Sequence, residues 1–192
     1  EAINLGMRHV SGEILAYLNS DDVLLPGSLN YVADFFLNNP DVDVIYSHRI
    51  IINEHDKEIG RWILPRHDNN VILWADYVPQ ETLFWRRSIW EKAGGQMDES
   101  YQFALDWDML VRFRNAGAKM VRVPRFLAAF RVQSSQKTSM HMNSTGLAEM
   151  NRLRRQIHYR DVDWGEIMRN IKPYLNRSVW YHKLHWMGIL RY

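Results

Sequence analysis

Cysteine is absent from the 192 residues of the chain, and this absence excludes several classes of chemistry. Disulfides, zinc–thiolate sites, iron–sulfur clusters and cysteine nucleophiles all require the missing thiol. A chain without cysteine suits a reducing compartment, where disulfides would not persist. We therefore expect a cytoplasmic protein that carries out no thiol chemistry.

Long apolar runs are also lacking. No stretch reaches the ~18 consecutive apolar residues that indicate a membrane-spanning helix. The chain opens Glu-Ala-Ile-Asn, without the basic and then apolar run of a signal peptide and without a starting Met, so we expect a piece of a longer protein. With 46% hydrophobic and 24% charged residues it can bury a sizeable core, which argues against disorder and coiled coil.

Familiar catalytic and nucleotide-binding motifs are missing as well. Neither GxGxxG nor GxxxxGK[ST] occurs, so the sequence has no glycine-rich phosphate loop, and no serine lies in GxSxG. The eight histidines form no HExxH pattern. His182 and His185 are three apart on an expected helix, but no third metal ligand is evident, so we interpret them as structural.

Acidic residues are scarce in the last third of the chain. The net charge of +2 divides into 12 basic against 18 acidic residues over 1–124, and 12 against 4 over 125–192. A basic segment favours an anionic partner, or else it is a solvated helical surface, which is how we interpret the cluster Arg152, Arg154 and Arg155. No nucleic-acid-binding module is recognisable, so we do not expect nucleic acid as the partner.

What the sequence does contain is an alternation of short apolar runs and helical periodicity, which is typical of an α/β fold. The expected strands are 13–18, 41–46, 50–52, 62–64, 82–85, 120–123 and 126–130. The expected helices are 1–10, 26–37, 89–93, 105–116, 146–160, 164–170 and 175–192. Pro124 is expected to separate two strands, since proline cannot donate to a strand ladder.

An acidic pair, Asp21 and Asp22, follows the first apolar run directly. Open α/β sheets bind ligands beyond the carboxyl ends of their strands, and adjacent carboxylates repel unless a cation neutralises them. Oxygen ligands suit Mg²⁺ or Mn²⁺, which commonly bridge carboxylates to phosphates. The alternative is a helix N-cap, because Asp22 lies a few residues before Pro26.

A second acidic group, Asp106 and Asp108, lies at the start of the expected helix 105–116. Carboxylates are favoured there by the helix dipole, so the pair has a structural explanation. Trp107 lies between them, and a flat aromatic beside a carboxylate can hold a sugar face while the acid handles a hydroxyl. Both interpretations remain open at this point.

Several blocks of sequence, in their order and spacing, resemble the family 2 glycosyltransferases. The first are Ala2-Ile3-Asn4-Leu5-Gly6, the run from Ser11 to Asp22, and Pro26-Gly27-Ser28-Leu29. The next are the run from Pro79 to Arg87, Gly94-Gly95 and Asp98-Glu99. The last are the runs 105–112 and 128–131, and Gln136-Lys137-Thr138. The resemblance covers roughly residues 1–139, and we expect 140–192 to be a separate basic, helical extension.

The resemblance implies a GT-A fold, a mixed α/β sheet similar to a Rossmann domain. It also implies a nucleotide-sugar donor, a divalent metal (Mn²⁺ or Mg²⁺) and inversion at the anomeric carbon. The chain begins at the block that normally follows the family's first nucleotide-binding strands. It therefore looks like the carboxyl-terminal two-thirds of an enzyme, which leaves open whether this chain alone is active.

The family's residue roles transfer to this sequence by motif. Asp21 aligns with the metal-binding acid of the DXD motif, and Asp22 extends it, while Asn19 replaces the motif's first acid. Asp106 aligns with the general base, although Leu105 replaces the Glu that usually precedes it. The resemblance adds Asn4, Asn19 and Asp21 as donor contacts, and Gln80, Glu81 and Trp107 as acceptor contacts.

We therefore expect an enzyme that moves a sugar to a hydroxyl of a saccharide or lipid-linked acceptor in polysaccharide or glycolipid assembly. The alternative is a non-catalytic fragment that binds a partner or a membrane. Residues 175–192 mix tryptophan and tyrosine with basic residues, which predicts a peripheral contact with the inner face of the cell membrane. Packing of that segment against the domain or a second subunit is the competing interpretation.

Overall fold

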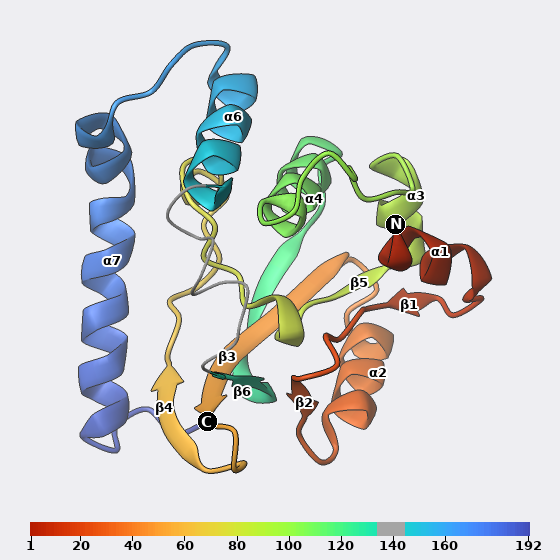
Figure 1. The fold of residues 1–192 in the computed structure, drawn as a ribbon. Coiled ribbons are helices and arrows are strands. Elements are labelled where there is room, and N and C mark those ends of the chain that lie inside the picture. The colour runs from red at the N-terminus through yellow and green to blue at the C-terminus, as the bar shows by residue number, and fades with distance from the viewer. Residues whose placement is uncertain (134–144) are drawn as a thin grey trace.

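The computed structural model describes residues 1–133 and 145–192. Gln136, Lys137, Thr138 and the expected boundary between 139 and 140 lie outside these residues. Within them the chain forms one mixed α/β sheet with helices on both faces, followed by a helical segment, as the sequence predicts (Figure 1). None of the described helices combines the length and the apolar character that a bilayer crossing requires.

The helices of the described part are as follows: α1 (Ala2–His9), α2 (Ser28–Asn38), α3 (Arg87–Lys92), α4 (Leu105–Asn115), α6 (Leu147–His158) and α7 (Trp164–Trp186). Two short 3₁₀ helices are η1 (Val71–Leu73) and η2 (Gln80–Thr82). The strands are β1 (Ile14–Leu15), β2 (Val23–Leu24), β3 (Val44–Ile52), β4 (Glu58–Trp62), β5 (Phe84–Arg86) and β6 (Met120–Arg131).

The sheet is built around β3 and β6, which pair in parallel, with the other pairings antiparallel. Its order is β1-β5-β3-β6-β2, and β4 adds to β3. Successive residues of a strand point to opposite faces, and β3 shows this directly. Val44 and Tyr46 face the larger core beneath α3, α4, α6 and α7, whereas Ile45 faces the smaller core beneath α2.

The strand at 120–131 is continuous, which corrects the expectation that Pro124 would divide it. The pairing with β3 shifts register between Tyr46 and His48, where Arg122 and Phe126 are the partners on β6. Pro124 therefore lies in a β-bulge, where its missing N–H removes no ladder bond. The strand region expected from 41–46 and 50–52 is the single strand β3, which begins at Val44 and runs without a break to Ile52.

The expected helices 164–170 and 175–192 are one helix, α7, which continues through Pro173 to Trp186. Ile167, Ile171 and Tyr174 bury one side of it against the larger core. Its later turns are held to the segment after β4, since His182 Nε2 accepts the N–H of Ile63 at 3.1 Å. Packing against the domain is thus observed for one face of the C-terminal segment.

The arginines of α6 are not the uniformly solvated face that the sequence suggests. Arg154 is 7% exposed, lies 5.1 Å from the ring centroid of Trp107 and donates to the carbonyl of Trp74 at 2.9 Å. Arg155 does face solvent, where it pairs with Asp161. Arg154 therefore packs α6 onto α4, because a guanidinium can stack on an aromatic face while its N–H groups donate to nearby acceptors.

Candidate active site

A cleft of about 1090 Å³ opens at the start of α4, between α1, the segment after β1 and the start of α6. Small-molecule sites are typically clefts of this scale, lined by apolar groups and a few polar ones. Its polar side chains are those of Tyr17, Asn19, Asp76, Gln102, Asp106 and Thr145. Asp106, the expected general base, therefore lies in a cleft that can hold a ligand.

Asp106 occupies the first turn of α4, which begins at Leu105 as the helical periodicity predicts. Gly117, at φ +84°, ends the same helix region in the left-handed conformation that glycine adopts without strain. The Tyr17 hydroxyl donates a hydrogen bond to Asp106 Oδ1. Burial raises the pKa of Asp106 to about 7, which is the range in which a carboxylate is an effective proton acceptor at neutral pH.

The start of α4 is held by a carboxylate from α6. Glu149 accepts the backbone N–H groups of Gln102, Phe103 and Ala104, at distances between 2.8 and 3.1 Å. No side chain caps α4 at its N-cap residue, Ala104, so Glu149 satisfies donors that a local cap would otherwise serve. Glu149, which lies outside the expected catalytic region 1–139, thus fixes the turn that presents Asp106.

A chain of hydrogen bonds connects the Asp106 side of the cleft to the acidic pair. Gln80 Nε2 donates to the Tyr17 carbonyl at 2.7 Å, and Gln80 Oε1 accepts from Asn19 Nδ2 at 3.0 Å. The same Asn19 amide lies 3.4 Å from Asp22 Oδ2. The structure therefore brings Asn19 and Asp106, which are far apart in sequence, to one cleft. Gln80, one of the expected acceptor contacts, bonds through both ends of its side-chain amide to the segment that carries Tyr17 and Asn19.

Asp22 is buried and does not cap a helix, so the N-cap interpretation is wrong. Its Oδ1 accepts the backbone N–H of Arg131 at 3.0 Å, whereas α2 begins after Gly27 without a side-chain cap. Burial is the main cause that raises the pKa of Asp22, and the charges of Glu81 and Asp21 raise it further. Negative charge is therefore concentrated at this point, and a cation would relieve it.

The acidic pair fits a divalent metal that completes its ligands from a substrate. Mg²⁺ is typically bound through one or two protein carboxylates plus phosphate oxygens rather than by an all-protein cage. Across residues 1–133 and 145–192, no group of three or more His, Cys, Asp or Glu side chains is placed to hold an ion by itself. Asp21 and Asp22 can supply the two carboxylates of a site that is completed by phosphate oxygens, and the diphosphate of a substrate would supply those oxygens.

Asn4 is not brought to the cleft, although it was expected to contact the donor. It is buried on α1, where its amide pairs with both the N–H and the carbonyl of Met97, at 2.7 and 3.0 Å, and with Glu99. It lines a different cavity, beside Arg112. The sequence block that contains Asn4 thus serves to attach α1 to the loop after α3.

Two of the expected acceptor contacts, Trp107 and Glu81, are buried and already paired within the fold. Trp107 is fully buried, and its indole N–H donates to the Ile72 carbonyl at 2.6 Å, so its ring offers no face to a sugar. Glu81 is also buried and forms a two-point ion pair with Arg49, at 2.6 and 2.7 Å. Both side chains support the cleft from behind, because their polar atoms are already paired within the fold.

Asp76 is a site residue that the sequence analysis missed. It lies before η2, lines the cleft with Asp106, and accepts the N–H of Val78 at 3.1 Å. Its side chain is exposed to the cleft, yet the protein around it raises its pKa to about 6 by desolvation. The only sequence signal was its position a few residues before the Pro79-Gln80-Glu81 block, and an isolated acid in a loop carries little information.

Comparisons with known proteins identify the family and the fold. The family model described as "Glycosyl transferase family 2" matches residues 1–126. No curated protein matches the sequence of the chain. The structure of S. aureus TarS 1–349 in complex with UDP-GlcNAc is similar with a TM-score of 0.58 and 16% identity, over 91% of this chain and 51% of that one.

A second structure of S. aureus TarS is similar with a TM-score of 0.55 and 15% identity, over 91% of this chain and 30% of that chain. The chain thus spans about half or less of the length of these proteins. At such identities the likeness shows the fold alone, and the family match covers the cleft residues from Ile3 to Trp107 but not Thr145, Gly146 and Met150.

Proposed function

The chain belongs to glycosyl transferase family 2, and on that premise we propose that its cleft transfers a sugar from a nucleotide-sugar donor to a hydroxyl acceptor. The observation that carries this proposal is Asp106, a carboxylate with a pKa of about 7 in the cleft, oriented by Tyr17. Such a group can remove the proton of an acceptor hydroxyl as the hydroxyl attacks. TarS, whose fold is similar, was solved in complex with UDP-GlcNAc, which supports a donor of this class.

In the proposed reaction the acceptor oxygen bonds to the anomeric carbon while the bond to the nucleoside diphosphate breaks. Asp106 takes the hydroxyl proton, and attack on the face opposite the leaving group inverts the anomeric centre. Glycosyl transfer resembles glycoside hydrolysis in its oxocarbenium-like transition state, where charge develops on both sides of the sugar. A saccharide or lipid-linked hydroxyl is the acceptor we propose.

Asp21 and Asp22 would hold a divalent metal, Mn²⁺ or Mg²⁺, whose chemistry is to stabilise the charge that develops on a diphosphate leaving group. The support is the donor set described above: two adjacent carboxylates, one of them buried with a raised pKa. Asn19 lines the cleft and its side-chain amide donates to Asp22, so it can orient this acid.

A transfer assay on the full-length protein tests the proposal. Nucleotide sugars are screened with Mn²⁺ for release of the nucleoside diphosphate, and the active donor is then compared between wild type and Asp106→Asn. Turnover should fall by ~100-fold or more, since asparagine is nearly isosteric but accepts no proton. Asp108→Asn is the matched control, because Asp108 pairs with Arg112 on the same helix. Equal losses in both variants would contradict the role of Asp106 as the base, and the absence of any active donor would favour a non-catalytic binding module.

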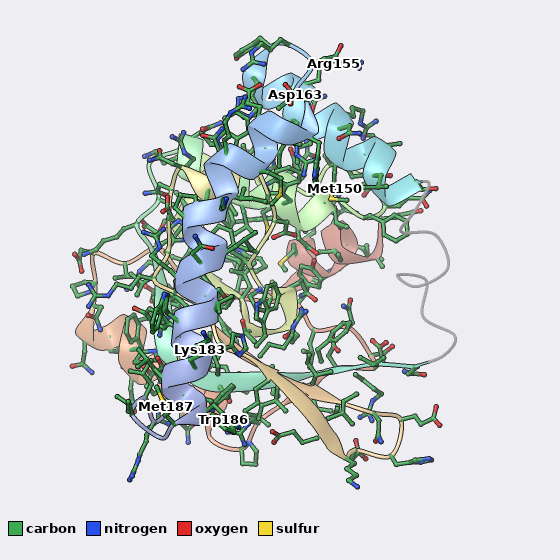
Figure 2. The ribbon with its side chains drawn as sticks, turned by 90° about the vertical axis from the view of Figure 1, so that its left-hand side faces the viewer. Met150, Arg155, Asp163, Lys183, Trp186 and Met187 are labelled. Carbon is green, nitrogen blue, oxygen red and sulfur yellow. The ribbon has the colours of Figure 1, made fainter. Side chains whose placement is uncertain are left out.

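We also propose that the end of α7 rests on the cytoplasmic face of the cell membrane and brings the cleft to a lipid-linked acceptor. Trp180 and Trp186 are 62% and 89% exposed, and Met187 and Ile189 are exposed beside them. Figure 2 shows Trp186, Met187 and Lys183 together at this end of α7, opposite Asp163. Tryptophan favours the headgroup region, and each basic residue near an anionic surface adds ~1 kcal/mol.

Vesicle co-sedimentation tests this contact. Wild type should sediment with anionic vesicles and not with neutral ones, and added salt should weaken the binding. Trp186→Ala should reduce it, whereas Trp164→Ala, a tryptophan 68% exposed at the other end of α7, should not. Equal effects of the two substitutions, or no sedimentation at all, would leave the exposed end of α7 without a membrane role.

A further inference from the structure

A second cavity, of about 580 Å³, lies apart from the Asp106 cleft and shares no lining residue with it. Three segments meet there: the residues that follow β4, the first half of β6, and the C-terminal part of the chain from α7 onward. The residues that carry the argument are Arg66, Arg122, Pro124, Tyr181, Leu190 and Tyr192. The volume falls within the ~300–1,000 Å³ of typical small-molecule sites.

The cavity is positively charged. Two guanidinium groups, those of Arg66 and Arg122, line it, and none of its described lining residues is acidic. Arg66 is exposed and forms no ion pair or hydrogen bond with any residue in 1–133 or 145–192. His67 adds no charge at neutral pH, because burial lowers its pKa. The charge of Arg66 is therefore available to a ligand.

Arg122 is held in a fixed position by the fold. Its Nε donates to the Pro65 carbonyl at 3.1 Å, and its Nη1 lies 3.3 Å from His48 Nε2. Its guanidinium carbon is 5.9 Å from the ring centroids of both Tyr181 and Tyr192. A guanidinium close to two phenol rings gives the cavity one cationic end with preorganised donors and aromatic neighbours.

We propose that this cavity binds a phosphate group carried on an apolar or ring-bearing body. The planar N–H fork of arginine matches phosphate oxygens, and two arginines without a competing carboxylate favour an anion. Pro124, Leu190 and the tyrosine rings provide apolar contact for the rest of the ligand. The phosphate can come from a soluble organic phosphate or from a lipid headgroup, since Tyr181 and Leu190 belong to the segment that carries the exposed Trp186.

Titration of the chain with phenyl phosphate, with inorganic phosphate and phenol as comparators, tests the pocket. Calorimetry should show phenyl phosphate binding at least tenfold more tightly than phenol, because both the charge and the ring are needed. Arg66→Ala should weaken that binding by about tenfold or more, and Arg66→Lys should restore part of it. Arg169→Ala removes the same charge from the exposed face of α7, outside the cavity, and should change nothing.

Since Arg66 has no partner within the described fold, Arg66→Ala should keep the wild-type melting temperature, so a loss of binding would report the pocket itself. Equal binding by Arg66→Ala and Arg169→Ala, or phenol binding as tightly as phenyl phosphate, would overturn the proposal. The readout is independent of glycosyl transfer, so it stands or falls separately from the role of Asp106.

Vesicles separate the two sources of the phosphate. Phosphatidic acid presents a phosphate monoester, whereas phosphatidylglycerol at matched surface charge does not. Preference for phosphatidic acid that is lost in Arg66→Ala assigns the pocket to a lipid phosphate. Phenyl phosphate binding without such a preference assigns it to a soluble phosphate, and the absence of both contradicts a phosphate pocket.

Discussion

The Tyr17 hydroxyl donates a hydrogen bond to the carboxylate of Asp106, and this bond joins the segment after β1 to the first turn of α4. The two residues are 89 positions apart in the chain. Burial raises the pKa of Asp106, while a donated hydrogen bond favours the charged form of a carboxylate. The pair thus combines an acid whose pKa lies near neutrality with a donor that fixes the position of the acid.

Substituting Tyr17 should move the pH dependence of the reaction. A general base acts in its deprotonated form, so kcat/KM should rise as the pH passes through about 7, the pKa of Asp106. Tyr17→Phe removes the donor, which destabilises the carboxylate and shifts this rise to higher pH by ~1 unit, equivalent to ~1.4 kcal/mol. The measurement is kcat/KM against pH for both proteins.

Tyr31→Phe is the control for that experiment, because Tyr31 is a phenol on α2, beside the smaller core. It should leave the profile in place. If Tyr17→Phe lowers the rate equally at all pH values, the hydroxyl contributes to folding or substrate contact and does not tune Asp106.

Loss of Asp21 should abolish metal-dependent binding of the donor's leaving group. Calorimetric titration of the full-length protein with a nucleoside diphosphate should show binding that requires Mn²⁺, and Asp21→Ala should eliminate it. Asp41→Ala is the matched control, since Asp41 is an exposed acid that pairs with Lys119 and does not line the cleft. Unchanged titration curves for Asp21→Ala would contradict the assignment of the acidic pair to a metal.

The helix that carries Asp106 could be predicted because its signals are local. The spacing of apolar residues from Leu105 to Phe113 and the glycine at 117 define it without reference to the rest of the chain. The orientation of Trp107 could not be predicted in the same way. Its burial depends on the Ile72 carbonyl and on Arg154 of α6, which are neighbours only in space.

The same distinction explains the other differences. The break expected at Pro124 follows from a local rule, whereas the bulge that accommodates this proline depends on pairing with β3. The roles expected for Glu81 and Asn4 were drawn from motifs, and their observed partners, Arg49 and Met97, are distant in sequence. Asp76 and Glu149 gave no motif at all, because their importance comes from the elements that meet around them.

The contribution of His48 to the stability of the fold should fall as the pH is lowered from 7 to 5, opposite in sign to the contributions of Asp106 and Asp76, whose pKa values are raised. This ring is fully buried on β3, its Nδ1 accepts the N–H of Leu64 at 3.0 Å, and burial together with the charges of Arg122, His185 and His182 lowers its pKa to about 3. The unfolded state, with an ordinary histidine pKa of ~6.5, then binds more protons than the folded state at pH 5.

Because the folded pKa is depressed, the contribution of His48 is complete above pH ~6.5 and falls by ~1.4 kcal/mol per unit below it. Urea unfolding at pH 7 and pH 5 should therefore differ by ~2 kcal/mol from this residue. The difference in unfolding free energy between pH 7 and pH 5 should change by this amount in His48→Gln, whereas the exposed His55 can be replaced by Gln without effect. An unchanged slope in His48→Gln would contradict a neutral His48 in the folded state.

Glu149 should matter for catalysis although it is remote in sequence from Asp106. Its carboxylate accepts three backbone N–H groups ahead of α4, and these bonds lower its pKa against the opposing effect of burial. Glu149→Gln replaces one accepting oxygen with an N–H₂ group that faces donors, which should cost ~1–3 kcal/mol of stability. The turn that presents Asp106 should then loosen, so kcat should fall more than donor affinity.

Glu166→Gln is the control for this prediction, since Glu166 is an exposed acid near the start of α7 that pairs with Arg160. This substitution should leave kcat unchanged. It should lower the unfolding free energy by no more than a surface ion pair contributes, ~0–1 kcal/mol. Initial rates with the active donor and urea unfolding are measured for both variants. If Glu149→Gln lowers stability while kcat at a temperature well below the melting transition stays at the wild-type value, the carboxylate holds α6 to the domain without positioning Asp106.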